Sequence, residues 1–409
     1  MKLSLIVCVY NTDKGYLQEA LGSIAASTLK DYEICLVDDG SDVDYSDIAA
    51  AFGARLCKKE NGGILSARLS GIEMAQGDYL AFFDSDDTVS IHYHQPMLDE
   101  AERTGADIVM NDWAFHTEKS RYFCRTDSSI ANNLSVEGDE VLTRFFSQEG
   151  REQSYYVTWN KIYRSSLLKY AREKILRSPI GERRISFGED VLFNFYAFEK
   201  AKKLSNLHTG YYFYRMHANQ SVNVIGEERL ASQIDAMGRV FDMMEQEISA
   251  KKDSAALLRH LNEWRALMAR THYSHALGGK FTELYPKIGE VYGVKKLKKA
   301  IWRDSAVYYK VTLLGNNFME IDAALRPLFD MNGTVALCYD KRDPYVTRIL
   351  SILSNRGVDV RYQRDAKRSV PKRVIRTKDK ILHNDVVYAV GVLLFKKGSK
   401  LRALLKRIL

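Results

Sequence analysis

The chain has 409 residues, of which 46% are hydrophobic and 27% charged, and its formal net charge is +8. This length and composition indicate a globular protein of two or three domains, and the few prolines and the lack of repeats argue against a fibrous or disordered chain. The five cysteines are odd in number and form no CxxC pair, which argues against a disulfide framework and a cysteine zinc site. We therefore expect a reducing compartment, the cytoplasm.

The first hundred residues alternate apolar runs with helical patterns. Asp13 and Lys14 follow the first run without a small-residue cleavage site, so this run predicts a buried strand rather than a signal peptide. Strands are predicted at 3–9, 33–37, 54–57 and 79–83, and helices at 16–27, 45–52 and 65–75. This alternation predicts an α/β fold with a mostly parallel, Rossmann-like central sheet that is covered on both faces. In such a sheet, ligands bind beyond the carboxyl ends of the strands.

The remaining chain has three parts with different patterns. Residues 92–225 mix strands and helices and complete a first domain, 1–225. Residues 226–330 are predicted to be a helical region, chiefly from the patterns at 239–248 and 255–277. Residues 331–409 are predicted to be a small basic α/β region with a strand at 335–339, a helix at 345–356 and a strand at 358–362.

An acidic cluster, Asp84-Ser85-Asp86-Asp87, follows the predicted strand 79–83. Three carboxylates this close repel one another unless a cation lies among them. Mg²⁺ or Mn²⁺ is the expected cation, because such ions take oxygen ligands and are held by one or two carboxylates together with substrate phosphates. The alternative is a solvated loop, with Asp87 as the N-cap of a helix.

Two further elements follow the strands of this domain. Asp38-Asp39-Gly40-Ser41 comes after the strand 33–37, where a carboxylate can accept a hydrogen bond from a base N–H or a ribose hydroxyl; an ordinary Asp-Gly turn is the alternative. Asn61-Gly62-Gly63 precedes the predicted helix that carries Arg68. These glycines permit a close approach of the backbone to a ligand, and Arg68 is suited to pair with a phosphate or stack on a base.

The order of these motifs resembles that of the family 2 glycosyltransferases of GT-A fold, over roughly residues 1–224. The resemblance rests on Val9-Tyr10-Asn11, Val37–Ser41, Asn61–Arg68 and Phe82–Asp87. It implies that Tyr10 and Asp39 flank a nucleotide base and that Arg68 helps to fix the nucleotide. It also implies that Asp84 and Asp86 form the DxD motif, which holds Mn²⁺ or Mg²⁺ on a diphosphate. Since uracil offers an N3–H donor to Asp39, we expect a UDP-sugar as donor substrate.

Three later segments are similar to further motifs of the same family: Trp159–Arg164, Phe187–Phe193 and Tyr212–Val222. A sugar hydroxyl is a poor nucleophile, so a carboxylate about 3 Å away must take its proton during attack. We predict Asp190 as this general base, with Glu189 orienting it or holding the acceptor. The alternative is a structural Glu-Asp pair at a helix N-terminus, which the helix dipole favours.

Three residues in these later segments have two interpretations each. The resemblance implies that His217 contacts the diphosphate or the metal from a loop that closes over the donor, whereas a lone histidine is otherwise a structural residue. Arg215 either binds a phosphate or pairs with a nearby acid. Trp159 either stacks on the acceptor or belongs to the core.

Together these features predict an inverting, metal-dependent glycosyltransferase with a GT-A domain at 1–225. We expect it to move a sugar to a hydroxyl of a saccharide or lipid-linked saccharide, by analogy with bacterial surface-polysaccharide assembly. The alternatives are a GT-A-like nucleotidyltransferase and a non-catalytic nucleotide-sugar-binding scaffold. The Gly-Glu-Asp and Tyr-Arg-x-His segments argue against the first alternative, and intact Asp84, Asp86 and Asp190 argue against the second.

The last part of the chain is strongly basic. Residues 361–409 hold fifteen Lys and Arg against three Asp, a net charge of +12, which leaves −4 for the rest of the chain. At 399–409 one helix face collects Leu401, Leu404, Leu405 and Ile408 between basic residues, which predicts a helix that docks on an anionic membrane surface. A solvated helix packed on its own domain is the alternative. Nucleic acid is not an expected partner, because no recognition motif accompanies the charge, and no apolar run reaches the roughly 18–20 residues of a membrane span.

Overall fold

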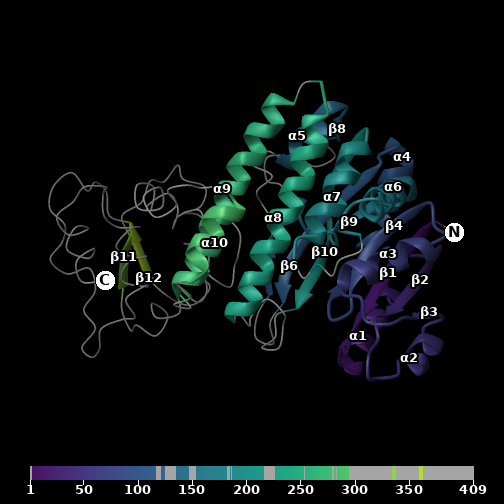
Figure 1. The fold of residues 1–409 in the computed structure, drawn as a ribbon. Helices are drawn as coiled ribbons and strands as arrows, with labels where there is room; N and C mark the ends of the chain where they lie inside the picture. The colour runs from purple at the N-terminus through teal and green to yellow at the C-terminus, as the bar shows by residue number, and fades with distance from the viewer. Residues whose placement is uncertain are drawn as a thin grey trace. The chain divides into compact units, whose positions relative to one another are not determined.

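The computed structural model describes residues 2–116, 121–124, 135–146, 153–181, 185, 187–215, 226–252, 254–278, 281, 283–293, 334–337 and 359–362. The chain divides into two compact units, Met1–Ala266 and Leu267–Leu409, and each is described by itself. Figure 1 shows the elements in chain order, from purple at the N-terminus to yellow. The domain boundaries predicted at 225 and 330 stay predictions.

The first hundred residues form the expected alternation of strands and helices. The elements are β1 (Leu3–Val9), α1 (Lys14–Ala25), β2 (Tyr32–Asp38), α2 (Ser46–Ala51), β3 (Arg55–Lys58), α3 (Ile64–Met74) and β4 (Tyr79–Asp84). Their strands are all parallel, in the order β3-β2-β1-β4. Nearly every residue of β1 and β2 is buried, because helices cover both faces of a parallel sheet. The predicted α/β class with a parallel central sheet is confirmed.

Beyond β4 the same sheet continues with strands of both directions. Among the described residues the whole sheet has ten strands. Next to β4 come β9 (Lys161–Arg164), β6 (Ile108–His116), β10 (Lys203–Arg215) and β5 (Thr88–Val89), while β7 (Arg121–Cys124) pairs with β6 and β8 (Ser135–Glu137) with β10. Strand β9 is antiparallel to both β4 and β6, whereas β10 is parallel to β6. It follows that β6 and β10 run in the same direction as β4.

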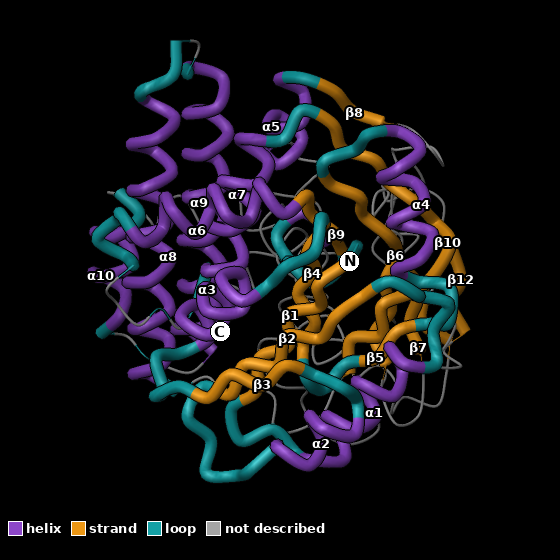
Figure 2. Tube along the Cα trace, turned by 90° about the vertical axis from the view of Figure 1, so that its right-hand side faces the viewer, coloured by secondary structure: helices purple, strands orange, loops and turns teal. Residues whose placement is uncertain are grey.

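Helices pack on this sheet from both sides. They are α4 (His94–Thr104), α5 (Asp139–Phe146), α6 (Ser165–Leu176), α7 (Glu189–Lys200) and α8 (Glu227–Ser249), and a short 3-10 helix spans Gln153–Tyr155. In Figure 2, α3, α6, α7 and α8 lie to the left of the strands, and α1 and α2 lie below them. All residues of α7 from Val191 to Phe198 are buried, because the helix is packed between α6, α5 and α8.

Helices continue after α8 with α9 (Ala255–Gly278) and α10 (Leu284–Val291), as expected for the helical region. In the second unit, β11 (Thr334–Leu337) and β12 (Asp359–Tyr362) pair in parallel, as the two predicted strands of a βαβ-like stretch should. The helix predicted between them and the helix predicted at 399–409 lie outside the described residues. Among the described helices, none combines the length and hydropathy that a membrane span requires.

Candidate functional site

The carboxyl ends of β1, β2 and β4 meet at one edge of the sheet, because the three strands are neighbours and parallel. Val9 of β1 lies opposite Asp38 of β2, and Cys8 lies opposite Asp84 of β4. The turns that begin at Tyr10, Asp39 and Asp84 therefore start side by side. The structure thus brings together three motifs that are separated by about thirty to forty-five residues each in the sequence.

Tyr10 and Asp39 differ in their accessibility at this edge. Tyr10 is 54% exposed, so its side chain is accessible to a ligand. Asp39 is buried, and its carboxylate accepts hydrogen bonds from the backbone N–H groups of Gly62 (3.0 Å) and Gly63 (2.7 Å) and from Lys59 Nζ (2.7 Å). Among the described residues, Asp39 Oδ2 accepts a single hydrogen bond, which leaves a lone pair for a further donor.

The two loops at this edge require glycine. Gly40 has φ +79°, and a Cβ at this position would lie 2.7 Å from the backbone N of Asn61. Gly63 has φ +84° at the start of α3, a conformation that L side chains rarely adopt. The Asp-Gly and Asn-Gly-Gly sequences therefore allow the loop after β2 and the loop before α3 to touch.

Arg68 of α3 is buried at the centre of a cluster of three carboxylates. Its guanidinium bonds Asp84 Oδ1 at 3.4 Å and Glu189 Oε1 at 3.2 Å, and it also bonds Asp190 Oδ1. The Arg68 guanidinium carbon lies 5.2 Å from the centre of the Phe82 ring, so the ring packs against the guanidinium. Arg68 was expected to fix a nucleotide; in the structure it joins the end of β4 to the beginning of α7.

In the acidic turn after β4, burial and the neighbouring carboxylates raise the pKa of two aspartates. Burial raises the pKa of Asp84 to about 6, against the effect of Arg68 and with the Asp86 carboxylate adding to the rise. Burial also raises the pKa of Asp87 well above its usual range, and Asp86 and Asp84 contribute. Asp87 accepts the backbone N–H of Arg215 at 2.7 Å, so it ties β10 to the turn.

The donor set of this turn fits a divalent cation. Asp84 and Asp86 are only partly buried, so their carboxylates are accessible. Among the described residues, no group of three or more His, Cys, Asp or Glu side chains is arranged to hold a metal ion by itself. A pair of carboxylates that leaves the other positions to phosphate and water is the usual mode for Mg²⁺ in nucleotide sites.

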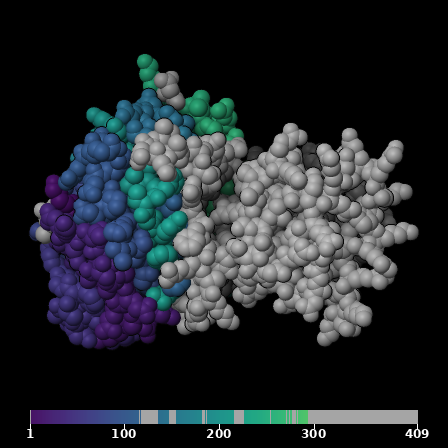
Figure 3. Space-filling view, turned by 180° about the vertical axis from the view of Figure 1, so that it is seen from behind, coloured from purple at the N-terminus to yellow at the C-terminus, as the bar shows by residue number. Residues whose placement is uncertain are grey.

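Arg215 pairs with an acid, which is one of its two interpretations. Its Nε donates to the backbone carbonyl of Asp86 at 2.7 Å, its Nη2 bonds Glu19 of α1, and its guanidinium lies 4.7 Å from the centre of the Tyr16 ring. Figure 3 shows purple N-terminal residues and teal residues of the segment that includes β10 on one face of this unit. His217 lies outside the described residues.

Trp159 has the environment of a core aromatic, the second of its two interpretations. It is 3% exposed and stacks on Tyr212, with ring centres 4.6 Å apart, and on Tyr214, with centres 5.7 Å apart. The Tyr212 hydroxyl in turn accepts the backbone N–H of Asp84 at 3.0 Å. Trp159 therefore supports the acidic turn through Tyr212, and little of its ring surface remains for an acceptor.

Trp159→Phe is expected to lower the free energy of unfolding by about 1 kcal/mol, the usual value of an aromatic pair beyond its area. Urea unfolding of the full chain measures this loss. The KM of the acceptor in a transfer assay is expected to stay unchanged. An increase in that KM with unaltered stability would instead support acceptor stacking.

Glu189 and Asp190 occupy the first turn of α7. The helix begins after Gly188, whose φ of +88° and close approach to Met237 Sδ require glycine. The Asp190 side chain is 26% exposed, and Thr158 Oγ1 lies 3.4 Å from its Oδ1. Two acids in a first turn agree with the structural alternative, since the helix dipole favours them. Their pairing with Arg68 is not explained by the helix dipole, and it brings Asp190 close to Asp84 of β4.

Comparison with known proteins agrees with this arrangement. Residues 4–172 match the family model described as Glycosyl transferase family 2. This part of the chain is therefore similar to glycosyl transferase family 2. Similar proteins include two from Bacillus subtilis (strain 168). The uncharacterized glycosyltransferase EpsJ is 30% identical over 54% of this chain and 63% of that protein, and the putative glycosyltransferase EpsH is 33% identical over 54% and 62%. The chain thus spans just over three fifths of the length of these curated relatives.

A similar fold is also found among solved structures. Crystalline S. aureus TarS 1-349 in complex with UDP-GlcNAc aligns with a TM-score of 0.51, at 20% sequence identity, over 80% of this chain and 86% of that chain. At this identity the likeness shows the fold alone. It agrees with the GT-A architecture expected of the family.

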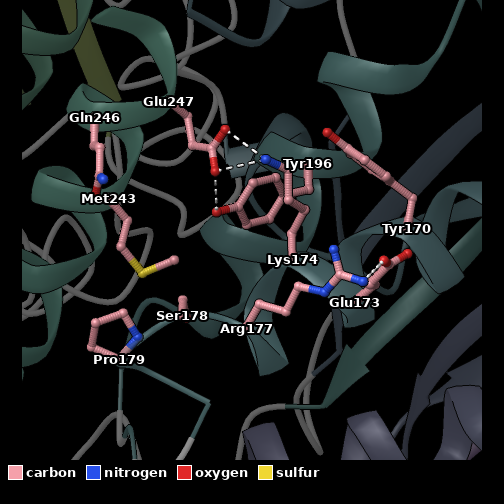
Figure 4. Close-up of a pocket in the computed structure, with 10 residues that line it drawn as sticks. All are labelled: Tyr170, Glu173, Lys174, Arg177, Ser178, Pro179, Tyr196, Met243, Gln246 and Glu247. Atoms are coloured by element: carbon pink, nitrogen blue, oxygen red, sulfur yellow. Dashed lines mark hydrogen bonds and ion pairs between the residues drawn. The ribbon is translucent and has the colours of Figure 1, made fainter. Parts of the chain in front are cut away.

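A separate pocket of about 350 Å³ lies between α6, α7 and α8 (Figure 4). Its charged groups pair with one another: Lys174 Nζ bonds both oxygens of Glu247, at 2.9 and 2.8 Å, and Arg177 pairs with Glu173 at 2.6 Å. Tyr196 at the centre of Figure 4 donates to Glu247 at 3.5 Å. None of the ten residues around this pocket belongs to the predicted site, and the pairing of its charges accounts for their presence as links between helices.

Sequence reasoning missed three polar residues beside the candidate site: Thr158, Lys161 and Asn194. Asn194 is the one amide in the otherwise apolar stretch Val191–Phe198, which is the signal that could have identified it. Lys161 lies within the segment Trp159–Arg164 between apolar residues, but a single lysine in a short strand carries no indication of burial. Nothing in the sequence distinguishes Thr158.

Proposed function

We propose that the chain is an inverting, metal-dependent glycosyltransferase that transfers a sugar from a UDP-sugar to a hydroxyl of a saccharide or lipid-linked saccharide. The observation that carries the proposal is the pairing of Asp84 and Asp190 with the same Arg68 guanidinium. This pairing places a carboxylate suited to a metal-diphosphate next to a carboxylate suited to a general base. Cell-surface polysaccharide synthesis is the proposed setting, by analogy with the family.

The donor is proposed to bind along the edge formed by the turns after β1, β2 and β4. The exposed side chain of Tyr10 can stack on a uracil ring. The remaining lone pair of Asp39 Oδ2 can accept the uracil N3–H, while Lys59 donates to Oδ1 of the same carboxylate. A solved structure of this fold holds UDP-GlcNAc, which supports a UDP-sugar as the class of donor.

Asp84 and Asp86 are the residues that would hold Mn²⁺ or Mg²⁺ together with the diphosphate. When bound, the cation supplies positive charge that offsets the negative charge on the leaving UDP. The half-buried position of both carboxylates beside the diphosphate-binding edge suits this role.

Asp190 is proposed to take the proton of the acceptor hydroxyl. As the hydroxyl oxygen forms its bond to the anomeric carbon, the bond from that carbon to the phosphate oxygen breaks and UDP leaves with the electron pair. The Arg68 guanidinium and the Thr158 hydroxyl both lie at Oδ1, so the other oxygen is the one presented to the acceptor. Attack from the face opposite to UDP gives a product of inverted anomeric configuration.

The tail at 361–409 is proposed to make peripheral contact with an anionic membrane surface, at its cytoplasmic face. This part of the proposal is supported by the charge and spacing of the sequence, since the residues concerned lie outside those that the structure describes. A lipid-linked acceptor would be reached most readily from such a position.

Calorimetric titration tests the donor site directly. The wild-type chain is titrated with UDP, GDP, CMP and a panel of UDP-sugars, with and without Mn²⁺. We expect UDP and one UDP-sugar to bind in a metal-dependent manner, and Asp86→Asn to weaken this binding by at least about tenfold, since one of two carboxylate ligands is lost. Asp47→Asn, which removes an exposed acid of α2 that pairs with Lys14, is the matched control and is expected to bind normally.

Each of the alternatives has its own outcome in this experiment. Binding of several nucleotides without turnover of any UDP-sugar to a glycoside would favour a nucleotidyltransferase. Tight UDP-sugar binding without transfer to any acceptor would favour a non-catalytic scaffold. Binding without metal dependence, equal in the Asp86→Asn variant, would refute the role of Asp84 and Asp86.

A further inference from the structure

Two fully buried polar side chains hold the segment 154–158, which includes the last two residues of the 3-10 helix and leads toward β9. They are Lys161 on β9 and Asn194 on α7, and together they are called the buried clamp below. The segment that they hold ends at Thr158, the residue whose hydroxyl faces the Asp190 carboxylate. The side chain of Thr158 thus lies between the segment that the clamp holds and the carboxylate of the proposed base.

The Lys161 ammonium uses all of its protons on this segment. It donates to the carbonyls of Ser154 and Val157, both at 2.5 Å, and to Asn160 Oδ1 at 2.6 Å. Three acceptors match the three protons of an ammonium, whereas a neutral amine has only two. Burial lowers the pKa of Lys161 well below its usual range, because a buried ammonium loses its hydration. Burying an ammonium here therefore costs free energy, which an apolar side chain of similar size would not cost.

Asn194 joins the same segment to the first turn of α7. Its Nδ2 donates to the carbonyl of Tyr156 at 2.8 Å and to the carbonyl of Asp190 itself at 2.9 Å, with the Val157 carbonyl at 3.3 Å. Its Oδ1 accepts the Tyr163 hydroxyl at 2.7 Å, so β9 is tied in as well. One amide therefore connects the backbone of the proposed base, the segment beside it and the strand beneath it.

We infer that Lys161 and Asn194 are positioning residues, which fix segment 154–158 against the first turn of α7 and so aim the Asp190 carboxylate. The inference rests on the proposed function of Asp190 as general base. With the clamp in place, Asp190 is held between Thr158 on one side and Arg68 on the other. A general base works only within hydrogen-bond reach of the hydroxyl, and a displacement of 1 Å costs roughly 10²-fold in rate.

The test uses the full chain with Lys161→Met and Asn194→Ala, made singly. We expect kcat to fall by roughly 10²-fold, as for a base displaced by 1 Å. The KM and Kd of the UDP-sugar are expected to stay within about twofold, because the donor edge on β1, β2 and β4 is not touched by the clamp. Ser4→Ala is the matched control: it breaks buried hydrogen bonds to Glu33 and Gly77 at the opposite edge of the sheet and should leave kcat unchanged.

A second comparison separates aiming from general loosening. In an Asp190→Asn background there is no base to aim, so the clamp variants should lower the residual rate no further. A further loss of equal size in that background would overturn the inference, as would an unchanged kcat in the single variants. Wild-type chain that transfers no sugar would count against the proposed function instead.

Hydrogen exchange gives a readout that does not depend on activity. Both clamp variants are expected to speed amide exchange at 156–158 and in the first turn of α7, while Ser4→Ala leaves these amides protected. Unchanged protection there in the clamp variants would show that the clamp does not hold the segment.

Discussion

Asp190→Asn is expected to lower kcat by about 10²- to 10⁴-fold, the usual contribution of a general base. The amide has the shape of the carboxylate but cannot take the proton of the acceptor hydroxyl. The Kd of the UDP-sugar should hardly change, because Asp190 lies on α7 rather than on the turns after β1, β2 and β4. Steady-state transfer kinetics at saturating donor, combined with calorimetry, measure both quantities.

Asp139→Asn is the matched control for this variant, since Asp139 is an exposed acid in the first turn of a different helix, α5. Its kcat should equal that of the wild type. If Glu189 and Asp190 were only partners of the helix dipole, Asp190→Asn would cost about 0.3–1 kcal/mol of stability and leave kcat intact. That result would remove Asp190 from the mechanism.

Arg68→Met is expected to cost about 3–5 kcal/mol of stability and to abolish transfer, because it leaves three neighbouring carboxylates without their counter-ion. Methionine fills a similar space above the Phe82 ring, so the loss of charge dominates the effect. Urea unfolding in the presence of a chelator measures the change in the free energy of unfolding without a bound cation.

This loss of stability is expected to grow with pH. Burial already raises the pKa of Asp84 to about 6, and removing Arg68, which lowers it, raises it further. A carboxyl group whose pKa is higher in the folded than in the unfolded state stabilises the fold while protonated, and this stabilisation is lost as the pH rises through the folded pKa. The cost of Arg68→Met should therefore be smaller at pH 5 than at pH 8.

Arg68→Lys separates charge from geometry. Lysine keeps the charge but cannot bond three carboxylates with a planar fork, so we expect intermediate stability and little activity. A cost of Arg68→Met that is below about 1 kcal/mol, or that is equal at both pH values, would show that the cluster behaves as an exposed ion pair.

The elements of the first hundred residues could be predicted closely from the sequence. Each predicted strand and helix there lies within two residues of the observed one, because apolar runs and Asp-Gly or Asn-Gly-Gly punctuation are local signals. The mixed part of the sheet was not predicted in the same detail. The position of β9 between β4 and β6 is a choice of partner strands far apart in the sequence, and no local pattern encodes that choice.

The partners of the predicted site residues could not be predicted from the sequence either, because these partners lie far away along the chain. Trp159 and Arg215 each had two interpretations, and only packing shows their contacts: Trp159 lies in an aromatic stack and Arg215 pairs with Glu19. For Arg68, the sequence offered a phosphate or a base as partner. The structure adds carboxylates from β4 and α7, which come within reach only when the chain has folded.

The sequence by itself determined the α/β class and the edge of the sheet where Tyr10, Asp39 and Asp84 gather. It could do so because parallel strands place their carboxyl ends at one edge, and because glycine and acidic turns mark those ends. Only the tertiary structure decided which charges meet there and how the buried clamp supports Asp190. Ion pairs and hydrogen bonds act over a few ångströms, and residues a hundred positions apart come that close only through the packing of α3, α7 and β9.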